Sequence, residues 1–244
     1  MATDVGRPAF YALAPGGWRD YVTLLHPPYT AWHLSYVAIG AALTPAFTWG
    51  RFLPTLAAFF LAVGVGAHAL DELKGRPLRT RIPGRVLAFL AIVSIGGAVA
   101  IGVVGALTAT PWLWLFVAAG GFIVVSYCLE LFSGRFHGDF WFALSWGAFP
   151  LMTAYFAAAE TLSAVAAAGA AFAFLLSAVQ RLLSTHVRDV RRRVTSVEGR
   201  VDRTDGTSEP VTAEFLLRGN EAALRGLAGA TVVLAAALVI MRVT

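Results

Sequence analysis

Two short motifs place histidine and carboxylate side chains at the ends of long apolar segments. His68, Asp71 and Glu72 lie in AHALDELKGRPLRTRIP, and His186 and Asp189 lie in LLSTHVRDVRRRV. Both motifs have the spacing HxxD, which places the imidazole and the carboxylate on one face of a helix. Each is followed by basic residues. The pattern suits a divalent cation, held by these five side chains, that bridges to a phosphorylated ligand.

Basic residues beside the motifs could neutralise the remaining phosphate charge. Guanidinium and ammonium groups bind phosphate oxygens through charge-assisted hydrogen bonds. We therefore assign diphosphate binding to Lys74, Arg76, Arg188 and Arg191. A second interpretation stays open, because ionisable side chains at a helix mouth also occur as interfacial groups without a ligand. In that case Arg188 or Arg191 would simply pair with Asp189.

The composition places these motifs in a membrane protein. Of the 244 residues, 58% are hydrophobic and 14% are charged, whereas about a quarter of the residues in a soluble domain are charged. The net charge of +5 comes from arginines between apolar segments, so it does not indicate a nucleic-acid partner. Cys128 is the single cysteine and excludes an intramolecular disulfide. The expected partners are membrane lipids and an isoprenoid or lipid small molecule; the oligomeric state is not indicated.

The pattern of apolar runs predicts an all-α, polytopic bundle of about seven transmembrane helices, each of roughly 20 residues. The expected spans are 30–49, 53–70, 85–108, 111–129, 139–158, 162–183 and 222–241. They form one transmembrane domain, 26–244, after an N-terminal tail, 1–25, and with one long loop at about 186–221. All lysines and arginines except Arg51 and Arg242, 17 of the 19, then fall on one side. Basic loops stay cytoplasmic, which predicts a cytoplasmic N-terminus and an external C-terminus in a bacterial plasma membrane.

At these motifs the chain resembles the UbiA superfamily of intramembrane prenyltransferases. The family carries an NDxxDxxxD-type motif with a following Arg-Pro-Leu segment, and a later DxxxD-type motif. AHALDELKGRPLRT is similar to the first motif and THVRDVRRR to the second, with Asp71 and Asp189 on family aspartates. LLHPPYTAWHLSYVAIGAAL and GDFWFALSWGAFPLMTAYF also resemble family helices, and the resemblance covers about residues 24–195.

The resemblance implies a UbiA-like fold and a prenyltransferase or a terpene-cyclase-like enzyme. It implies that Asp71 and Asp189 are catalytic, that Mg²⁺ is the cofactor, and that aromatic side chains line the pocket for the prenyl cation; Tyr36, Trp146 and Tyr155 are our candidates. The chain departs from the family at several carboxylate positions, which hold His68, Gly75 and Arg193, and it has seven expected spans where the family usually has nine. The changed ligands favour one Mg²⁺, or Zn²⁺, Mn²⁺ or Fe²⁺ in its place, or no catalytic metal.

Two other functions remain open at this point. The paired HxxD motifs could hold a transition metal in a different metalloenzyme on the same scaffold. The chain could also be a non-catalytic isoprenoid-binding or lipid-binding membrane protein. Under each enzymatic hypothesis we expect His68, Asp71, His186 and Asp189 to line one cavity on the cytoplasmic side.

Overall fold

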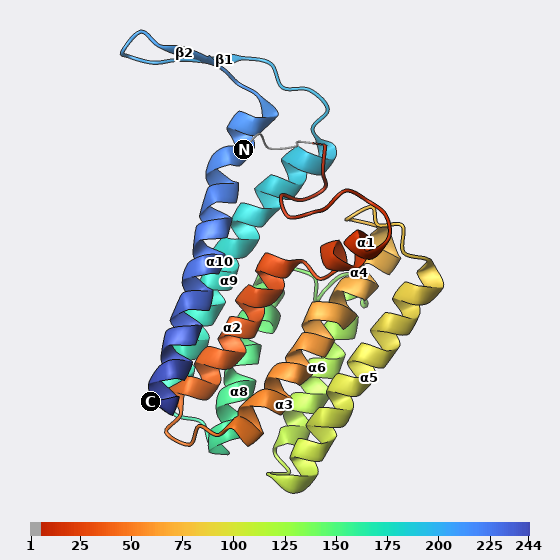
Figure 1. The fold of residues 1–244 in the computed structure, drawn as a ribbon, viewed down its shortest axis with the longest axis vertical. Helices are drawn as coiled ribbons and strands as arrows, with labels where there is room; N and C mark the ends of the chain where they lie inside the picture. Colours follow the sequence, from red (N-terminus) through yellow and green to blue (C-terminus); the bar gives the residue numbers. More distant parts are fainter. Residues whose placement is uncertain (1–5) are drawn as a thin grey trace.

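The computed structural model describes residues 6–244, which form a bundle of long helices (Figure 1). The helices are, in chain order, α1 (Trp18–Leu24), α2 (Pro27–Leu43), α3 (Trp49–Phe59), η1 (Phe60–Ala67), α4 (His68–Gly75), α5 (Gly84–Thr108), α6 (Leu113–Cys128), α7 (Asp139–Ala143), η2 (Leu144–Ala148), α8 (Phe149–Ala159), α9 (Ala164–Arg193) and α10 (Ala213–Val243).

Several of these elements join end to end into longer rods. α3, η1 and α4 form one continuous helix, and α7, η2 and α8 form another, with η1 and η2 as π-helical stretches inside them. Each expected apolar span overlaps one rod, but the bounds differ, since α2 ends at Leu43 and α9 continues to Arg193. Five rods are long and apolar enough to cross a membrane: Trp49–Gly75, Gly84–Thr108, Asp139–Ala159, Ala164–Arg193 and Ala213–Val243. α2, with 17 residues, and α6, with 16, are shorter. The chain is thus an integral membrane protein with five helices of clear spanning length.

The centre of the bundle is α2, which packs against α3, α8, α9 and α10. Trp32 and Tyr36 of α2 are completely buried, together with Leu151 of α8 and Leu217 of α10. α5 lies at the periphery and turns large apolar side chains outward, among them Ile92 and Leu107, which are 73% and 72% exposed. Extended outward-facing apolar surface marks a contact with lipid or with another protein, and lipid agrees with the composition.

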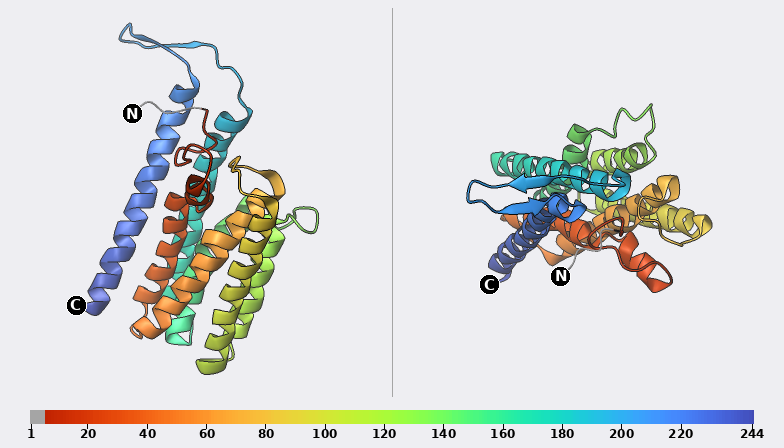
Figure 2. Two further views of the ribbon diagram at one scale, coloured as in Figure 1. Left: turned by 45° about the vertical axis from the view of Figure 1, so that its right-hand side comes forward. Right: turned by 90° about the horizontal axis from the view of Figure 1, so that it is seen from above.

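The connections gather unequally at the two ends of the bundle (Figures 1 and 2). The end drawn uppermost in Figure 1, called the upper end below, carries the N-terminal segment, α1, and the connections 76–83, 129–138 and 194–212. The lower end carries the C-terminus and three short turns. Both HxxD motifs lie near the upper end.

The long connection before α10 is more ordered than the sequence predicts. α9 continues to Arg193 and α10 begins at Ala213, so the connection spans 194–212 instead of 186–221. It contains a small antiparallel hairpin, β1 (Arg200–Asp202) with β2 (Ser208–Pro210), in which Val201 pairs with Glu209. The fold is therefore helical with one short hairpin. The Thr212 hydroxyl caps α10 by accepting a hydrogen bond from Phe215 N at 3.1 Å.

Candidate functional site

One face of α9 carries a polar stripe into the bundle. Ser177, Gln180 and Ser184 are buried, although their side chains are polar. Arg181, Arg188 and Arg192 continue the same face toward the upper end, at the spacing of one helical side. From Arg181 to Arg192 the helix rises about 16 Å. The stripe thus presents three guanidinium groups, one above another, to the helices that face α9.

Side chains from other elements surround the upper part of this stripe. Tyr11, His26, Tyr29, Asp71 and Arg188 are each half-buried, and electrostatic interactions link them to the arginines of the stripe. We call the region that these side chains surround the polar chamber, and Arg181, Arg192, His68 and Tyr127 also belong to it.

The electrostatics of the chamber favour an anion. Arg188 interacts with Arg181 and Arg192, and the like charges oppose one another. The pKa of His26 is lowered well below its ordinary value, mainly by burial and then by neighbouring His68, Arg192 and Arg188, so His26 is neutral at pH 7. The pKa of Tyr11 is raised by burial, so its hydroxyl keeps its proton. The chamber therefore combines fixed positive charge with neutral hydrogen-bond donors.

Asp71 is the carboxylate that faces the chamber. It lies opposite the Cys128 thiol of α6 and interacts with Arg181, Lys74 and Glu130. His68 lies one helical turn before it, and its Nδ1–H donates a hydrogen bond to Gly64 O at 3.1 Å. The His68 ring stacks on His26 with ring centroids 4.0 Å apart and planes 9° apart. The buried Tyr127 hydroxyl beside them has no hydrogen-bond partner among residues 6–244. A buried hydroxyl without a partner is an exception to the rule that buried polar groups are hydrogen-bonded.

Two residues expected at the site instead hold the connection 76–83 in place. Glu72 is completely buried and accepts hydrogen bonds from Leu78 N at 2.9 Å, Thr80 N at 2.8 Å and Thr80 Oγ1 at 2.8 Å. Arg76, in a left-handed conformation with φ 48°, donates to Ile82 O at 2.6 Å. A carboxylate that accepts three hydrogen bonds from this connection is not free to bind a metal ion.

The second HxxD motif faces away from the chamber. His186 is exposed, and the Asp189 side chain is 55% exposed and pairs with Arg193 at 3.5 Å. Arg191 is buried between α9 and α10 against Glu221, with Nε to Oε1 at 2.6 Å. Lys74 lies at the surface with Glu130 at 3.0 Å, and this hydrogen bond lowers the pKa of Glu130.

The expected five-ligand metal site does not assemble. Within residues 6–244, no three histidine, cysteine, aspartate or glutamate side chains come together closely enough to hold a metal ion. The reason is the phase of α9: a helix turns about 100° per residue, so the packing that points Arg188 inward points Asp189 outward. The donors present thus do not fit the Mg²⁺ site, or the Zn²⁺, Mn²⁺ or Fe²⁺ site, that the motifs predict.

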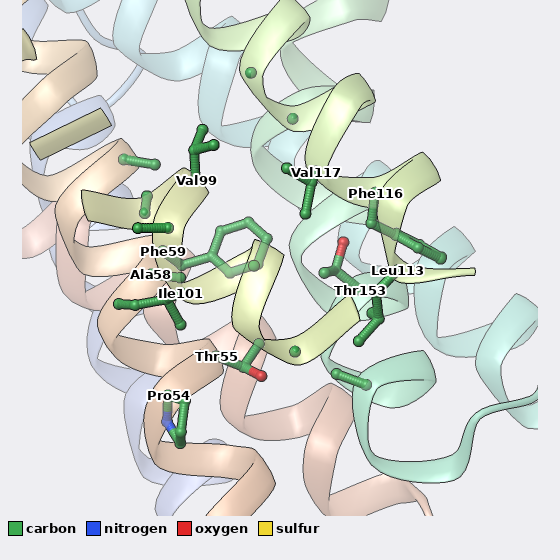
Figure 3. Close-up of a pocket in the computed structure, with 18 of the residues that line it drawn as sticks. Pro54, Thr55, Ala58, Phe59, Val99, Ile101, Leu113, Phe116, Val117 and Thr153 are labelled. Atoms are coloured by element: carbon green, nitrogen blue, oxygen red, sulfur yellow. The ribbon is translucent and has the colours of Figure 1, made fainter. Parts of the chain in front are cut away.

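Below the chamber lies an apolar cavity of about 600 Å³ between α3, η1, α5, α6 and α8. Figure 3 shows Phe59, Val99, Val117 and Phe116 around it, on three different helices. The helical faces that line the cavity continue into the chamber. Val63 of the lining is followed on the same helical face by Ala67 and Asp71, and Val124 is followed by Tyr127 and Cys128. Both π-helical stretches contribute to its upper end, and π-turns are frequent at functional sites.

The three aromatic side chains expected in a pocket have different positions. Trp146 lines the upper end of the cavity and contacts Tyr127 edge to face at 5.4 Å. Tyr36 is buried in the core, where its hydroxyl accepts from Trp32 Nε1 at 2.6 Å and from Ser177 Oγ at 3.1 Å. Tyr155 lies near the lower end and shares a hydrogen bond with Ser163 at 2.8 Å. Trp146 alone is placed between chamber and cavity.

Our sequence analysis did not assign Arg181, Arg192, Tyr11, His26 or Tyr127 to the site. The sequence of α9 does indicate its inward arginines. Ser177, Arg181, Ser184 and Arg188 follow one another at helical spacing, so they form a polar stripe on one side of an otherwise apolar helix. For Tyr11 and His26 no such signal exists, since they lie in irregular segments.

Comparisons of the chain with family models, with curated proteins and with solved structures gave no match. The resemblance to the UbiA superfamily therefore rests on the motifs, and the site is interpreted from its own geometry.

Proposed function

We propose that this membrane protein binds an isoprenyl diphosphate, with the diphosphate in the polar chamber and the prenyl chain in the apolar cavity. One observation supports the proposal: three arginines on the inward face of α9 belong to the polar chamber, and the α4 and α6 side chains of this chamber continue the helical faces that line the apolar cavity below. Guanidinium groups match phosphate oxygens, and an apolar cavity of this size falls in the usual range for small-molecule sites. A ligand that is anionic at one end and apolar at the other would match both the arginines and the apolar cavity.

The chemistry we propose is that of a divergent UbiA-like prenyltransferase or terpene-cyclase-like enzyme. The bond between C1 of an allylic chain and the diphosphate oxygen would break, with both electrons leaving on the diphosphate. Arg181, Arg188 and Arg192 would stabilise the charge that develops there. The Trp146 ring would face the allylic cation, which an acceptor captures or which cyclises with loss of a proton. We derive no step through a metal ion, because the donors do not fit one.

A second candidate is a non-catalytic isoprenoid-binding protein or carrier. The observation that favours it is the same lack of a three-ligand cluster among the described residues, since the resembling family relies on carboxylate-rich motifs. The third hypothesis, a transition-metal enzyme built on paired HxxD motifs, loses its geometric basis because the second motif faces outward.

We also propose that all seven rods cross the membrane, with the upper end cytoplasmic. α2 and α6 are about 26 Å and 24 Å long, slightly less than a hydrocarbon core of about 30 Å. α6 connects two rods of spanning length, and α2 leads into the first rod of spanning length, Trp49–Gly75. The polar chamber then opens toward the cytoplasmic leaflet, where prenyl diphosphates present their headgroups.

The test is a binding and turnover experiment on purified protein in lipid nanodiscs with radiolabelled geranylgeranyl diphosphate. We expect saturable binding, and pyrophosphate release if the chain is an enzyme. Arg188→Gln removes a chamber charge and should weaken binding about tenfold or more, as expected for a charge-assisted contact. Arg193→Gln is the matched control, since the Arg193 side chain is 83% exposed.

The outcomes separate the candidates. Binding with pyrophosphate release supports the enzyme, and binding without release for geranyl, farnesyl and geranylgeranyl diphosphates supports the carrier. Equal affinities for the wild type, Arg188→Gln and Arg193→Gln would show that the chamber is not the headgroup site. Absence of binding would overturn the proposal.

A further inference from the structure

The N-terminal segment lies over the chamber as part of its wall. We call residues 6–17 the strap. Arg192 Nε donates to Pro8 O at 3.3 Å, and Leu13 N donates to Thr23 Oγ1 at 3.0 Å. Ala9 and Ala12 are buried against Leu78 of the connection 76–83. The strap is thus attached to α9, α1 and the connection after α4, and these contacts fix the position of Tyr11.

Tyr11 points from the strap into the chamber. Its ring contacts Tyr29 edge to face at 5.5 Å and the tilted ring of His26 at 5.4 Å. The hydroxyl makes no hydrogen bond with any other residue of 6–244, while it interacts electrostatically with Arg192 and Arg188. This protonated hydroxyl lies beside two guanidinium groups and has no acceptor among residues 6–244, so it can donate a hydrogen bond to an anion.

We infer that Tyr11 donates a hydrogen bond to the anionic headgroup of the ligand, so that the strap supplies a binding residue of the site. This inference rests on the proposed function, because it takes the isoprenyl diphosphate as the ligand. It adds a requirement that the helical bundle alone does not contain: the headgroup is held by arginines of α9 from one side and by the strap from above. Tyr29, on the first turn of α2, presents a second hydroxyl to the same arginines.

The test compares two ligands that differ only in charge at one end. Geranylgeranyl diphosphate and geranylgeraniol are titrated onto the wild type, Tyr11→Phe and Tyr21→Phe in nanodiscs. Tyr21 is 44% exposed on α1 and serves as the matched control. We expect Tyr11→Phe to bind the diphosphate about tenfold more weakly, as for a lost hydrogen bond to a charged group, and to bind the alcohol as the wild type does. A structural defect would weaken both ligands equally.

A second measurement guards against misfolding of the phenylalanine variant. Tyr11→Cys is exposed to a small, charged methanethiosulfonate reagent, with native Cys128 as a buried background. Geranylgeranyl diphosphate should slow the modification several-fold and geranylgeraniol should not, while Tyr21→Cys should react at one rate throughout. If the wild type binds the diphosphate and neither Tyr11 experiment responds, the inference fails alone. If the wild type does not bind it, the proposed function fails as well.

Discussion

At the scale of single residues, side chains that are adjacent in the sequence face in different directions, one toward the chamber and the other away from it. Arg188 faces the chamber, whereas Asp189 is exposed and pairs with Arg193. Asp71 faces the chamber, whereas Glu72 is buried under the connection 76–83. In each case a rotation of about 100° along the helix separates a side chain that faces the chamber from one with a structural contact. A motif therefore assigns roles to its residues only when the rotation of the helix about its axis is known.

This contrast makes a direct prediction for the two motif aspartates. Asp71→Asn replaces a carboxyl group that faces the chamber and interacts with Lys74 and Arg181, and it should lower the rate of pyrophosphate release by about 10²-fold, the size seen for other preorganised electrostatic groups. Asp189→Asn removes an exposed carboxylate and should leave the rate within about twofold of the wild type. Steady-state assays of pyrophosphate release by the two purified variants test this prediction. An equal loss in both would restore the second motif to the site.

His26 predicts a dependence of stability on pH. An unfolded histidine has a pKa of about 6.5, and burial lowers the pKa of His26 well below this value. Below pH 6.5 the unfolded chain therefore binds a proton that the folded chain does not, so stability falls as the pH falls, by at most about 1.4 kcal/mol per pH unit. The groups that face His26 are His68, His33, Arg188, Arg192, Tyr11 and Tyr29, and each cation among them opposes the added charge.

The measurement is the Tm in detergent at pH 7.5 and pH 5.5. His26→Asn removes the titrating ring, and asparagine tolerates the left-handed backbone that His26 adopts at φ 46°. This variant should lose less Tm between the two pH values than the wild type. His186→Asn, which removes an exposed histidine, should lose as much as the wild type. A larger loss in His26→Asn would contradict the sign.

At the scale of elements, apolar runs and breakers predicted where the rods lie, but not how each rod is turned. The runs located every rod because twenty apolar residues favour a helix in lipid regardless of its neighbours. The rotation of α9 depends on how Val187, Val190 and Arg191 pack against α10, which is a long-range contact. His186 and Asp189 consequently lie near the end of α9 where the sequence analysis expected them, but on the side of the helix that faces away from the chamber.

Close contacts between rods predict which glycines are sensitive. A Cβ on Gly40 of α2 would overlap the backbone carbonyl of Leu151 on α8, so Gly40→Ala should force the two rods apart and destabilise the protein by about 1–3 kcal/mol. Gly229 of α10 meets no atom within 4 Å, and Gly229→Ala should be neutral or slightly stabilising. Thermal unfolding in detergent compares them. A Gly40→Ala variant as stable as the wild type would show that α2 and α8 pack less closely.

At the scale of the whole molecule, charge and lipophilicity are arranged along one axis. The upper end holds the strap, the chamber and 17 of the 19 basic residues, and the lower end holds Arg51 and Arg242. Both lower arginines are engaged within the protein, Arg51 with Glu160 at 2.7 Å and Arg242 with Ala42 O at 2.6 Å. The positive-inside rule, applied to the upper cations, predicts that the upper end is cytoplasmic.

The orientation predicts the outcome of a labelling experiment on intact cells. Asp205 lies at the hairpin between β1 and β2, and Thr161 lies at the lower turn between α8 and α9; both are exposed. A membrane-impermeant maleimide should label Thr161→Cys on intact cells and Asp205→Cys only after permeabilisation. The physical reason is that retaining the basic connections on the cytoplasmic side keeps them beside anionic lipid headgroups, where each is worth about 1 kcal/mol. Cys128 is buried and adds little background. α9 alone separates the two positions, so labelling of both on intact cells would mean that α9 does not cross the bilayer. The reverse pattern would invert the protein and place the chamber, with its arginines, on the side away from cytoplasmic prenyl diphosphates.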